Sequence, residues 1–344
     1  MSLLEFTGNG IYCPAAGVYL DPWKPVPKAL ISHGHSDHAS FGHGSYLCTT
    51  SAAPVIKHRL NLSGNIQTAD YNKPVSINGV EFSFHPAGHI PGSAQIRVAY
   101  KGEVWVFSGD YKLENDGISE PFEPQKCNVF ITESTFGLPV YKWKPQREVF
   151  DDINQWWRKN QAAGKVTILA GYALGKSQRI LRNVDPSIGK IFVHGAVDSL
   201  TQLLRNQHLE LPSTTYVTSE MKKKDFEGAL VLCPPSAIGS LWLRKFDPYS
   251  LGIASGWMGL RGARRRRGAD RGFVLSDHAD WTGLNNAVKA TEAAKVFVTH
   301  GYSDIFARWL SDQGIEAKAV KTQFEGELGE IAESGIDESK AEAA

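Results

Sequence analysis

The sequence has few cysteines and no long apolar run, and each shortage excludes a class of protein. The four cysteines lie far apart, without a Cys-x-x-Cys pair, at Cys13, Cys48, Cys127 and Cys233. This spacing argues against a disulfide-stabilised secreted scaffold and predicts reduced thiols in the cytosol. No apolar stretch approaches the roughly 20 residues that a membrane-spanning helix needs. The segment Met1–Phe6 also lacks the basic and apolar regions of a signal peptide, so we expect a cytoplasmic protein without a membrane partner.

The chain also lacks a strong net charge, because its formal charge is only +1 over 344 residues. The charges are nevertheless unevenly distributed. Six arginines lie between Arg261 and Arg271, and Lys222–Lys224 form a second basic run, whereas residues 325–344 carry seven acids and one lysine. A basic loop can follow a phosphate backbone, although a solvated surface loop is the alternative. The acidic end is expected to be a helical or disordered tail.

Metal-binding side chains are concentrated in one short stretch, His33-Gly34-His35-Ser36-Asp37-His38, which follows the apolar run Ala29–Ile31. The run predicts a buried strand, so the polar residues would lie on the loop that leaves it. Imidazole and carboxylate are ligands of catalytic zinc sites, which keep one position open for water. The loop contains two ligand pairs, which is enough to begin two metal sites.

Three further ligand candidates lie downstream. Asp110 and His300 each end an apolar strand beside a glycine, which lets the backbone bend close to a metal, and His89 follows a strand-like segment through a Pro-Ala-Gly loop. A carboxylate such as Asp110 can bridge two cations, which a histidine cannot. Two metal ions about 3.5–4 Å apart can clamp a phosphate and lower the pKa of a water.

An acid and a histidine add a second kind of chemistry. Glu133 ends the predicted strand 128–133, and His278 follows the apolar run Phe273–Leu275. Imidazole titrates close to neutral pH, so His278 is a candidate general acid, and Glu133 would orient it through a hydrogen bond. A purely structural ion pair between the two is the alternative.

Together these motifs resemble the metallo-β-lactamase superfamily and, in Glu133, His278 and His300, its β-CASP nuclease group. The segments 172–180 and 254–258 resemble parts of the domain that this group carries as an insertion. Within the group, the chain is most similar to the bacterial DNA-ligase-associated exonucleases of the SNM type, which share its motifs at 33–39, 87–93, 132–137 and 276–281.

The resemblance implies a complete site. One metal would be held by His33, His35 and His89, the other by Asp37, His38 and His300, and Asp110 would bridge them. The implied catalytic residues are Asp37, His278 and Glu133. Asp21 would lie behind the ligands and orient one of the histidines. The implied nucleic-acid-binding residues are Lys176, Ser255, Arg264, Arg265, Arg266 and Arg267. Two divalent ions are expected as cofactors, with zinc as the first choice and manganese as the alternative.

The implied activity is phosphodiester hydrolysis with a metal-bound hydroxide as nucleophile. The leading hypothesis is a 5′-to-3′ exonuclease of DNA repair that acts on single-stranded DNA or on a free 5′ end, with an ATP-dependent DNA ligase and a helicase as partners. An RNA-processing nuclease is the alternative, because His300 is shared with RNA-cleaving members. A glyoxalase-type thioester hydrolase and a non-catalytic nucleic-acid-binding scaffold are further alternatives. Nucleoside triphosphate binding is rejected, because Gly175-Lys176-Ser177 lacks the upstream glycine of a phosphate-binding loop.

The order of predicted elements indicates an α/β fold of two domains. Strands alternate with helices between about 166 and 255, as in a parallel sheet, and a 14-residue amphipathic helix at 146–159 precedes them. We therefore expect an αββα metallo-β-lactamase sandwich with an inserted parallel α/β domain. Its predicted parts are residues 1–144 and 266–324 for the sandwich, 145–265 for the β-CASP insertion, and 325–344 for the acidic tail.

Overall fold

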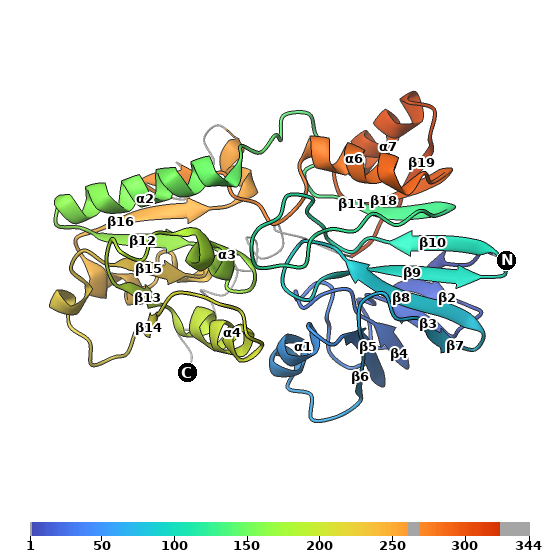
Figure 1. Cartoon of the computed structure of the whole chain (residues 1–344), viewed down its shortest axis with the longest axis horizontal. Helices are drawn as coiled ribbons and strands as arrows, with labels where there is room; N and C mark the ends of the chain where they lie inside the picture. Colours follow the sequence, from blue (N-terminus) through green and yellow to red (C-terminus); the bar gives the residue numbers. More distant parts are fainter. Residues whose placement is uncertain (1, 261–267, 324–344) are drawn as a thin grey trace. The chain divides into compact units, whose positions relative to one another are not determined.

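The computed structural model describes residues 2–260 and 268–323 of the chain (Figure 1). These residues form two compact units. The first unit contains residues 2–115, 119–142 and 278–323, and the second contains 116–118, 143–260 and 268–277. The second unit is thus inserted into the sequence of the first. The predicted acidic tail at 325–344 and the arginines Arg264, Arg265, Arg266 and Arg267 lie outside the described residues.

One sheet of the first unit is built from the N-terminal part of the chain. Its strand order is β1-β2-β3-β4-β5-β6, with antiparallel pairs up to β3 and parallel pairs from there on. Helix α1 (Ala53–Leu60) covers its outer face, where Ile56 and Leu60 pack with Ala29 and Tyr46. The strands are β1 (Glu5–Phe6), β2 (Ile11–Cys13), β3 (Val18–Leu20), β4 (Lys28–Leu30), β5 (Ser45–Thr49) and β6 (Ile66–Ala69).

The second sheet of this unit has the order β19-β18-β11-β10-β9-β8-β7. Its outer face is covered by α6 (Trp281–Thr291) and α7 (Ser303–Asp312), whose Leu284 and Phe306 pack with Phe130. The strands are β7 (Val75–Ile77), β8 (Val80–Pro86), β9 (Ala94–Tyr100), β10 (Glu103–Phe107), β11 (Val129–Ser134), β18 (Lys295–Gly301) and β19 (Glu316–Ala319).

The two sheets face one another across a shared apolar core. Leu20 and Leu47 of the first sheet belong to one buried cluster with Phe82, Ile96 and Phe107 of the second. Each sheet therefore buries one face against the other sheet and the opposite face against helices. This arrangement confirms the predicted αββα sandwich, with the helices in the outer layers.

The second unit is a parallel α/β domain. Its six strands have the order β14-β13-β15-β12-β16-β17, and every neighbouring pair is parallel. The strands are β12 (Val166–Ala170), β13 (Ile191–Val193), β14 (Thr215–Tyr216), β15 (Leu230–Cys233), β16 (Tyr249–Ala254) and β17 (Arg271–Phe273). The helices are α2 (Gln146–Ala162), α3 (Lys176–Asn183) and α4 (Gly195–Asn206), with the short 3-10 segments η1 (Lys223–Phe226), η2 (Pro235–Ala237), η3 (Leu241–Phe246) and η4 (Gly256–Gly259).

The two faces of this parallel sheet are covered differently. Helices α2 and α3 pack on one face, where Ile153, Trp157 and Ile180 lie against Leu169 and Leu232. The other face is covered by η1 and η3, through Phe226 and Phe246. The buried residues of α2 recur at helical spacing, so the predicted amphipathic helix is confirmed.

One predicted strand lies in a different sheet from the one expected. The strand expected near 273–275 forms as β17, but it pairs with β16 in the sheet of the second unit, whereas the sandwich was expected to resume at residue 266. A three-residue apolar run carries no information about which sheet it joins. The chain passes to the first unit after Asp277.

Two expectations from composition concern the cysteines and membrane spans. All four cysteine thiols are free, and burial raises the pKa of Cys48, Cys127 and Cys233 to about 12. These thiols are therefore protonated and unreactive near neutral pH. Within residues 2–260 and 268–323, no helix has the length and apolar character that a bilayer crossing requires.

Candidate metal centre

The predicted ligands lie at or just beyond the ends of four strands of the first unit. The loop after β4 carries His33, His35, Asp37 and His38, and the loop after β8 carries His89. Asp110 lies three residues beyond the end of β10, and His300 lies within β18 near its end. Because these strand ends meet at one edge of the sandwich, residues up to 267 positions apart in sequence reach one site.

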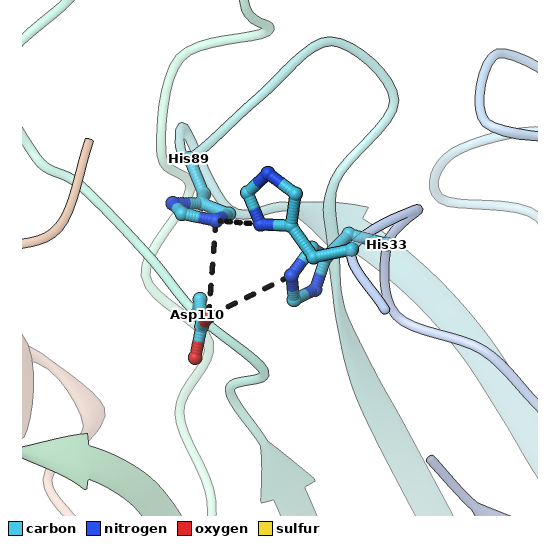
Figure 2. A group of neighbouring side chains, drawn as sticks. His33, His89 and Asp110 are labelled. Carbon is cyan, nitrogen blue, oxygen red and sulfur yellow. Dashed lines mark hydrogen bonds and ion pairs between the residues drawn. The ribbon is translucent and has the colours of Figure 1, made fainter. Parts of the chain in front are cut away.

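The first set of ligands gathers on one side of Asp110. Potential ligand atoms of His33, His35, His89 and Asp110 all lie within 4.8 Å of one another. Asp110 Oδ2 is 3.6 Å from His33 Nε2 and 3.7 Å from His89 Nε2, and His35 Nδ1 is 3.0 Å from His89 Nε2. Figure 2 shows His33 and His89 turned toward Asp110.

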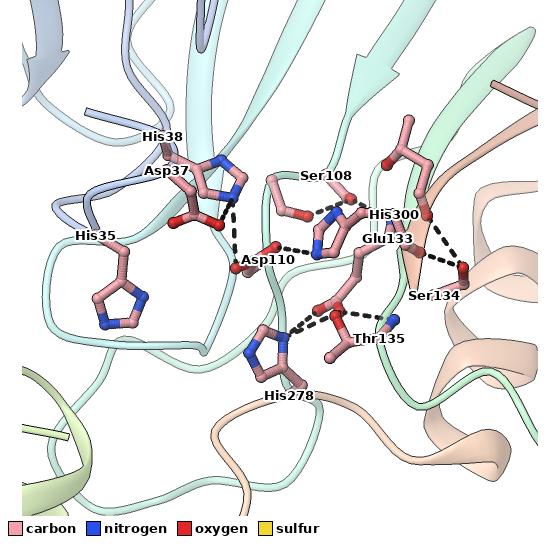
Figure 3. Close-up of polar contacts among 12 residues, drawn as sticks. His35, Asp37, His38, Ser108, Asp110, Glu133, Ser134, Thr135, His278 and His300 are labelled. Carbon is pink, nitrogen blue, oxygen red and sulfur yellow. Dashed lines mark hydrogen bonds and ion pairs between the residues drawn. The ribbon is translucent and has the colours of Figure 1, made fainter. Parts of the chain in front are cut away.

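The second set also converges on Asp110. His38 Nε2 is 3.4 Å from Asp110 Oδ2 and 3.6 Å from Asp37 Oδ2. His300 Nε2 lies 3.3 Å from the other carboxylate oxygen, Asp110 Oδ1. Figure 3 shows Asp110 between His38 and His300. Asp110 Oδ2 therefore faces histidines of both predicted sets, and Oδ1 faces His300, so this carboxylate is placed where a bridging ligand would lie.

These separations fit bound cations. Zinc–ligand bonds of about 2.0–2.2 Å in a tetrahedral arrangement place neighbouring donor atoms about 3.4 Å apart. The four nitrogen–oxygen distances to Asp110 range from 3.3 to 3.7 Å. In addition, His33 Nε2 is buried and makes no hydrogen bond within the described part of the chain. A buried acceptor without a partner is costly, and a cation at this position would remove that cost.

The protonation of two predicted ligands, His33 and Asp110, suits metal binding. Burial, together with the nearby His38, lowers the pKa of His33 well below its usual value, so this imidazole is neutral. Burial alone would raise the pKa of Asp110, but His38 and His300 hold it well below its usual range. Metal ions bind neutral imidazoles and ionised carboxylates, so His33 and Asp110 are in the binding form at neutral pH.

Asp21 lies behind the ligands, fully buried. Its Oδ2 accepts a hydrogen bond from His38 Nδ1 at 2.6 Å, and its Oδ1 accepts the backbone N–H of Ser32 at 2.7 Å. The Ser32 hydroxyl contacts Asp21 Oδ2 as well, and its Oγ lies 3.0 Å from His33 Nδ1. Ser32 was not among the predicted site residues, because a lone serine beside a metal motif has no sequence signature.

Glu133 and His278 form a second buried pair in the same unit. His278 Nδ1 is 2.9 Å from Glu133 Oε2, which also accepts the Thr135 hydroxyl at 2.5 Å, and Oε1 accepts the backbone N–H of Tyr111 at 2.8 Å. Burial would raise the pKa of Glu133, but His278 lowers it, so the carboxylate stays ionised. It therefore fixes the proton on His278 Nδ1 and the orientation of the ring (Figure 3).

The described nucleic-acid candidates belong to the second unit. The Lys176 side chain is fully buried, with Nζ 3.5 Å from Asp277 Oδ2 and 4.6 Å from the centre of the Tyr172 ring. Ser255 Oγ accepts the backbone N–H of Trp257 and begins η4. A further buried cation that the sequence did not single out, Arg179, donates to the Ser276 carbonyl and lies 3.3 Å from Asp277 Oδ1.

Comparison with known proteins gives relatives of two kinds. No family model matches the chain. The chain is 31% identical over 324 residues to a "Probable DNA ligase" of Opitutus terrae, a match that covers 93% of this chain and 31% of that protein. It is 34% identical over 122 residues to the "Endoribonuclease YSH1" of Saccharomyces cerevisiae, which covers 35% of this chain and 15% of the relative. The chain thus spans less than a third of the length of either relative.

A solved structure shares the fold. A protein of unknown function from Enterococcus faecalis V583 superimposes with a TM-score of 0.60 at 10% sequence identity, covering 87% of this chain and 80% of that one. At this identity the similarity concerns the fold alone. It extends over most of the chain, so it includes both compact units.

Proposed function

Since the chain belongs to the β-CASP group of the metallo-β-lactamase superfamily, we propose that it is a metal-dependent nuclease that hydrolyses phosphodiester bonds of DNA as a 5′-to-3′ exonuclease. The observation that carries this proposal is the position of Asp110. Its two carboxylate oxygens face histidines of both ligand sets, at 3.3 to 3.7 Å. A phosphodiester needs two neighbouring cations more than a thioester does, because its oxygens carry a negative charge.

Different residues of the chain would hold the cations, orient His278 and deliver the proton. The ligand sets would hold two divalent cations, zinc in the first place and manganese as the alternative, which when bound would neutralise the phosphate and lower the pKa of a water. Asp37 serves as a ligand beside His38. Glu133 accepts the Nδ1 proton of His278, and this leaves His278 Nε2 as the atom that delivers a proton to the leaving oxygen. The same hydrogen bond stabilises the imidazolium before the proton is transferred.

DNA is the preferred substrate, single-stranded or with a free 5′ end. The similarity to the protein named as a probable DNA ligase covers 93% of this chain, whereas the similarity to the named endoribonuclease covers 35%. A nuclease region joined to a ligase in one polypeptide would prepare ends that the ligase then seals. We therefore propose a role in DNA repair, with an ATP-dependent DNA ligase and a helicase as partners. Ser255 and the arginines at 264–267 remain the proposed contacts to the DNA strand, whereas Lys176, whose side chain is fully buried beside Asp277, is not among them.

RNA is the second candidate substrate. His300 Nε2 lies 3.3 Å from Asp110 Oδ1, and RNA-cleaving members of the group share a histidine at this position. The named endoribonuclease among the relatives supports the same reading.

A strand-digestion assay tests the proposal. Single-stranded DNA and RNA of one sequence, labelled at either end, would be incubated with the zinc- or manganese-loaded protein. The Asp110→Ala protein tests the site, and Asp185→Ala, which removes a partly exposed acid of the second unit that pairs with Arg158, is the matched control. We expect 5′-labelled DNA to yield mononucleotides, with no loss in Asp185→Ala and at least about a thousandfold loss in Asp110→Ala.

The other outcomes are equally informative. Cleavage of RNA alone would assign the chain to the RNA-processing branch. Internal cuts in DNA would contradict the exonuclease mode but keep the nuclease. If the metal-loaded protein cuts neither polymer, the nuclease proposal fails, and thioester hydrolysis becomes the activity to test. A purified chain that binds no metal would instead point to a non-catalytic nucleic-acid-binding role.

A further inference from the structure

The strongest unassigned feature is the hydrogen-bond network behind the ligands, in which one carboxylate touches both ligand sets. Asp21 contacts His38, which belongs to one set, directly, and it contacts Ser32, whose hydroxyl lies beside His33 of the other set. Asp21, Ser32, His33 and His38 are all fully buried. Bulk water therefore cannot replace any hydrogen bond that is lost within this network.

The donors in the network can be assigned from chemistry. The backbone N–H of Ser32 can only donate, so Asp21 Oδ1 is an acceptor, and His38 Nδ1 donates to Oδ2. The Ser32 hydroxyl has a single hydrogen, which points to Asp21 Oδ2. Ser32 Oγ must then accept a hydrogen bond from its other neighbour, His33 Nδ1, at 3.0 Å. His33 therefore carries its proton on Nδ1, and Nε2, the atom that faces Asp110, keeps its lone pair.

The same assignment holds for His38. Its Nδ1 proton is directed at Asp21 Oδ2, so Nε2, which lies 3.4 Å from Asp110 Oδ2, is the ligand atom. The backbone adapts to this arrangement, because Asp21 has a φ of 38°, in the left-handed region that favours glycine. Its N–H is also bonded to the Leu30 carbonyl at 2.9 Å, which fixes the aspartate beside the strand that leads into the ligand loop.

We propose that Ser32 is a positioning residue that relays the Asp21 carboxylate to His33, so that Asp21 sets the tautomer of one ligand histidine in each metal set. The inference rests on the metal centre of the proposed function, but it does not depend on the substrate. It predicts an asymmetry. Removing the Ser32 hydroxyl weakens only the metal held by the His33 set, whereas replacing Asp21 weakens both metals.

Zinc affinity tests this asymmetry without any activity measurement. The metal-free full chain and its variants would be titrated with zinc against a coloured chelator, and bound zinc would be counted after dialysis. We expect two zinc ions in the unaltered chain, about tenfold weaker binding of one ion in Ser32→Ala, and about tenfold weaker binding of both in Asp21→Asn. Ser32→Thr keeps the hydroxyl and should restore the affinity.

A matched control removes the same kind of bond elsewhere. Ser83 Oγ lies 2.9 Å from His85 Nε2, and neither residue belongs to the ligand sets. Ser83→Ala should leave both zinc affinities unchanged. Equal affinities in Ser32→Ala and the unaltered chain, or equal losses in Ser32→Ala and Ser83→Ala, would overturn the relay.

A measurement on the unaltered chain guards against variants that fail to fold. Nitrogen-15 NMR of the zinc-loaded protein should show the His33 proton on Nδ1, and a proton on Nε2 would refute the assignment. The outcomes also separate the two proposals. Two bound zinc ions without cleavage of nucleic acid would remove the proposed function and keep the relay, whereas an unaltered chain that binds no zinc would remove both.

Discussion

At the scale of single residues, His43 is a buried histidine whose environment keeps its imidazole neutral. Its Nδ1 accepts the backbone N–H of Val26 at 3.3 Å, and its Nε2 lies 3.1 Å from the Ser40 hydroxyl, which itself donates to the Pro22 carbonyl at 2.8 Å. Nδ1 cannot take up a proton without losing the bond to Val26. Burial accordingly lowers the pKa of His43 to about 4.

This lowered pKa predicts a loss of stability in acid. The unfolded chain binds a proton at His43 near pH 6.5, whereas the folded chain does so only near pH 4, so stability falls as the pH drops through this window. We expect a loss on the order of 1–3 kcal/mol by pH 4 from this group. In His43→Asn the pH dependence of urea unfolding between pH 7 and 4 should become shallower. It should not change in His58→Gln, which alters an exposed histidine. An unchanged slope in His43→Asn would contradict the assignment.

The backbone at position 301, directly after the predicted ligand His300, leaves no room for a side chain, so Gly301 is needed there. Its φ is +77°, and a Cβ there would lie 2.3 Å from the Ser134 carbonyl oxygen and 2.5 Å from Thr135 Cα. Gly314 has a similar φ of +85°, but no atom lies within 4 Å of its virtual Cβ. Gly314→Ala should therefore cost only the backbone strain, about 1–2 kcal/mol in unfolding free energy. Gly301→Ala should cost roughly 3 kcal/mol or more and weaken zinc binding. Equal losses of unfolding free energy in the two variants would show that strand β11 can shift to make room for the added methyl group.

At the scale of elements, the first turn of α3 points its polar side chains into the second unit. Arg179 and Lys176 are both buried, and both lie near the carboxylate of Asp277. Arg179→Met would remove one cation and the bond to the Ser276 carbonyl. We expect a loss of about 3 kcal/mol in unfolding free energy, moderated because Lys176 stays 3.5 Å from Asp277. Because Asp277 directly precedes His278, nuclease activity should fall as well.

Arg182→Met on the same helix is the control for this change. Arg182 is exposed and makes only a long bond of 3.4 Å to the Glu210 carbonyl among the contacts described. The unfolding free energy of Arg182→Met should lie within about 0.5 kcal/mol of that of the unaltered chain. If Arg179→Met and Arg182→Met have the same unfolding free energy in urea, the buried network around Arg179 contributes nothing to stability.

The elements that the sequence predicted well are those with a long or bounded apolar pattern. The strand predicted at 128–133 forms as β11, and the helix predicted at 146–159 forms as α2. Helix α1 was missed, because it is only eight residues long and has a proline in its first turn. The sequence also could not show that Lys176 is buried, since a helix N-terminus does not reveal which way its first turn faces.

The convergence of the seven predicted ligands could be predicted because each lies at or just beyond the end of a recognisable strand, and parallel strands end at one edge of a sheet. Ser32 could not. Its partner Asp21 is brought to it by the parallel pairing of β3 with β4, in which Tyr19 lies opposite Ala29 and Leu20 opposite Leu30. Such register is a property of the folded sheet. The residues that orient ligands therefore become visible only when strand pairing is known.

At the scale of the whole molecule, all seven predicted ligands belong to the first unit. A cation bound there stabilises the folded first unit and makes no contact with the second through these residues. Binding at 100 to 1,000 times the dissociation constant adds about 2.7–4.1 kcal/mol per site. Metal removal should therefore act on one unit of the chain and spare the other.

Hydrogen exchange followed by mass spectrometry measures this difference directly. After chelation, peptides covering β4, β10 and β18 should exchange at least about tenfold faster, because the stabilisation from the metals is lost. Peptides covering α2 and β12 of the second unit should keep their protection. In Asp110→Ala, which lacks the shared ligand, the chelator should change little. Equal loss of protection in both units would mean that they unfold as one cooperative body, and the metal centre would then stabilise the entire molecule.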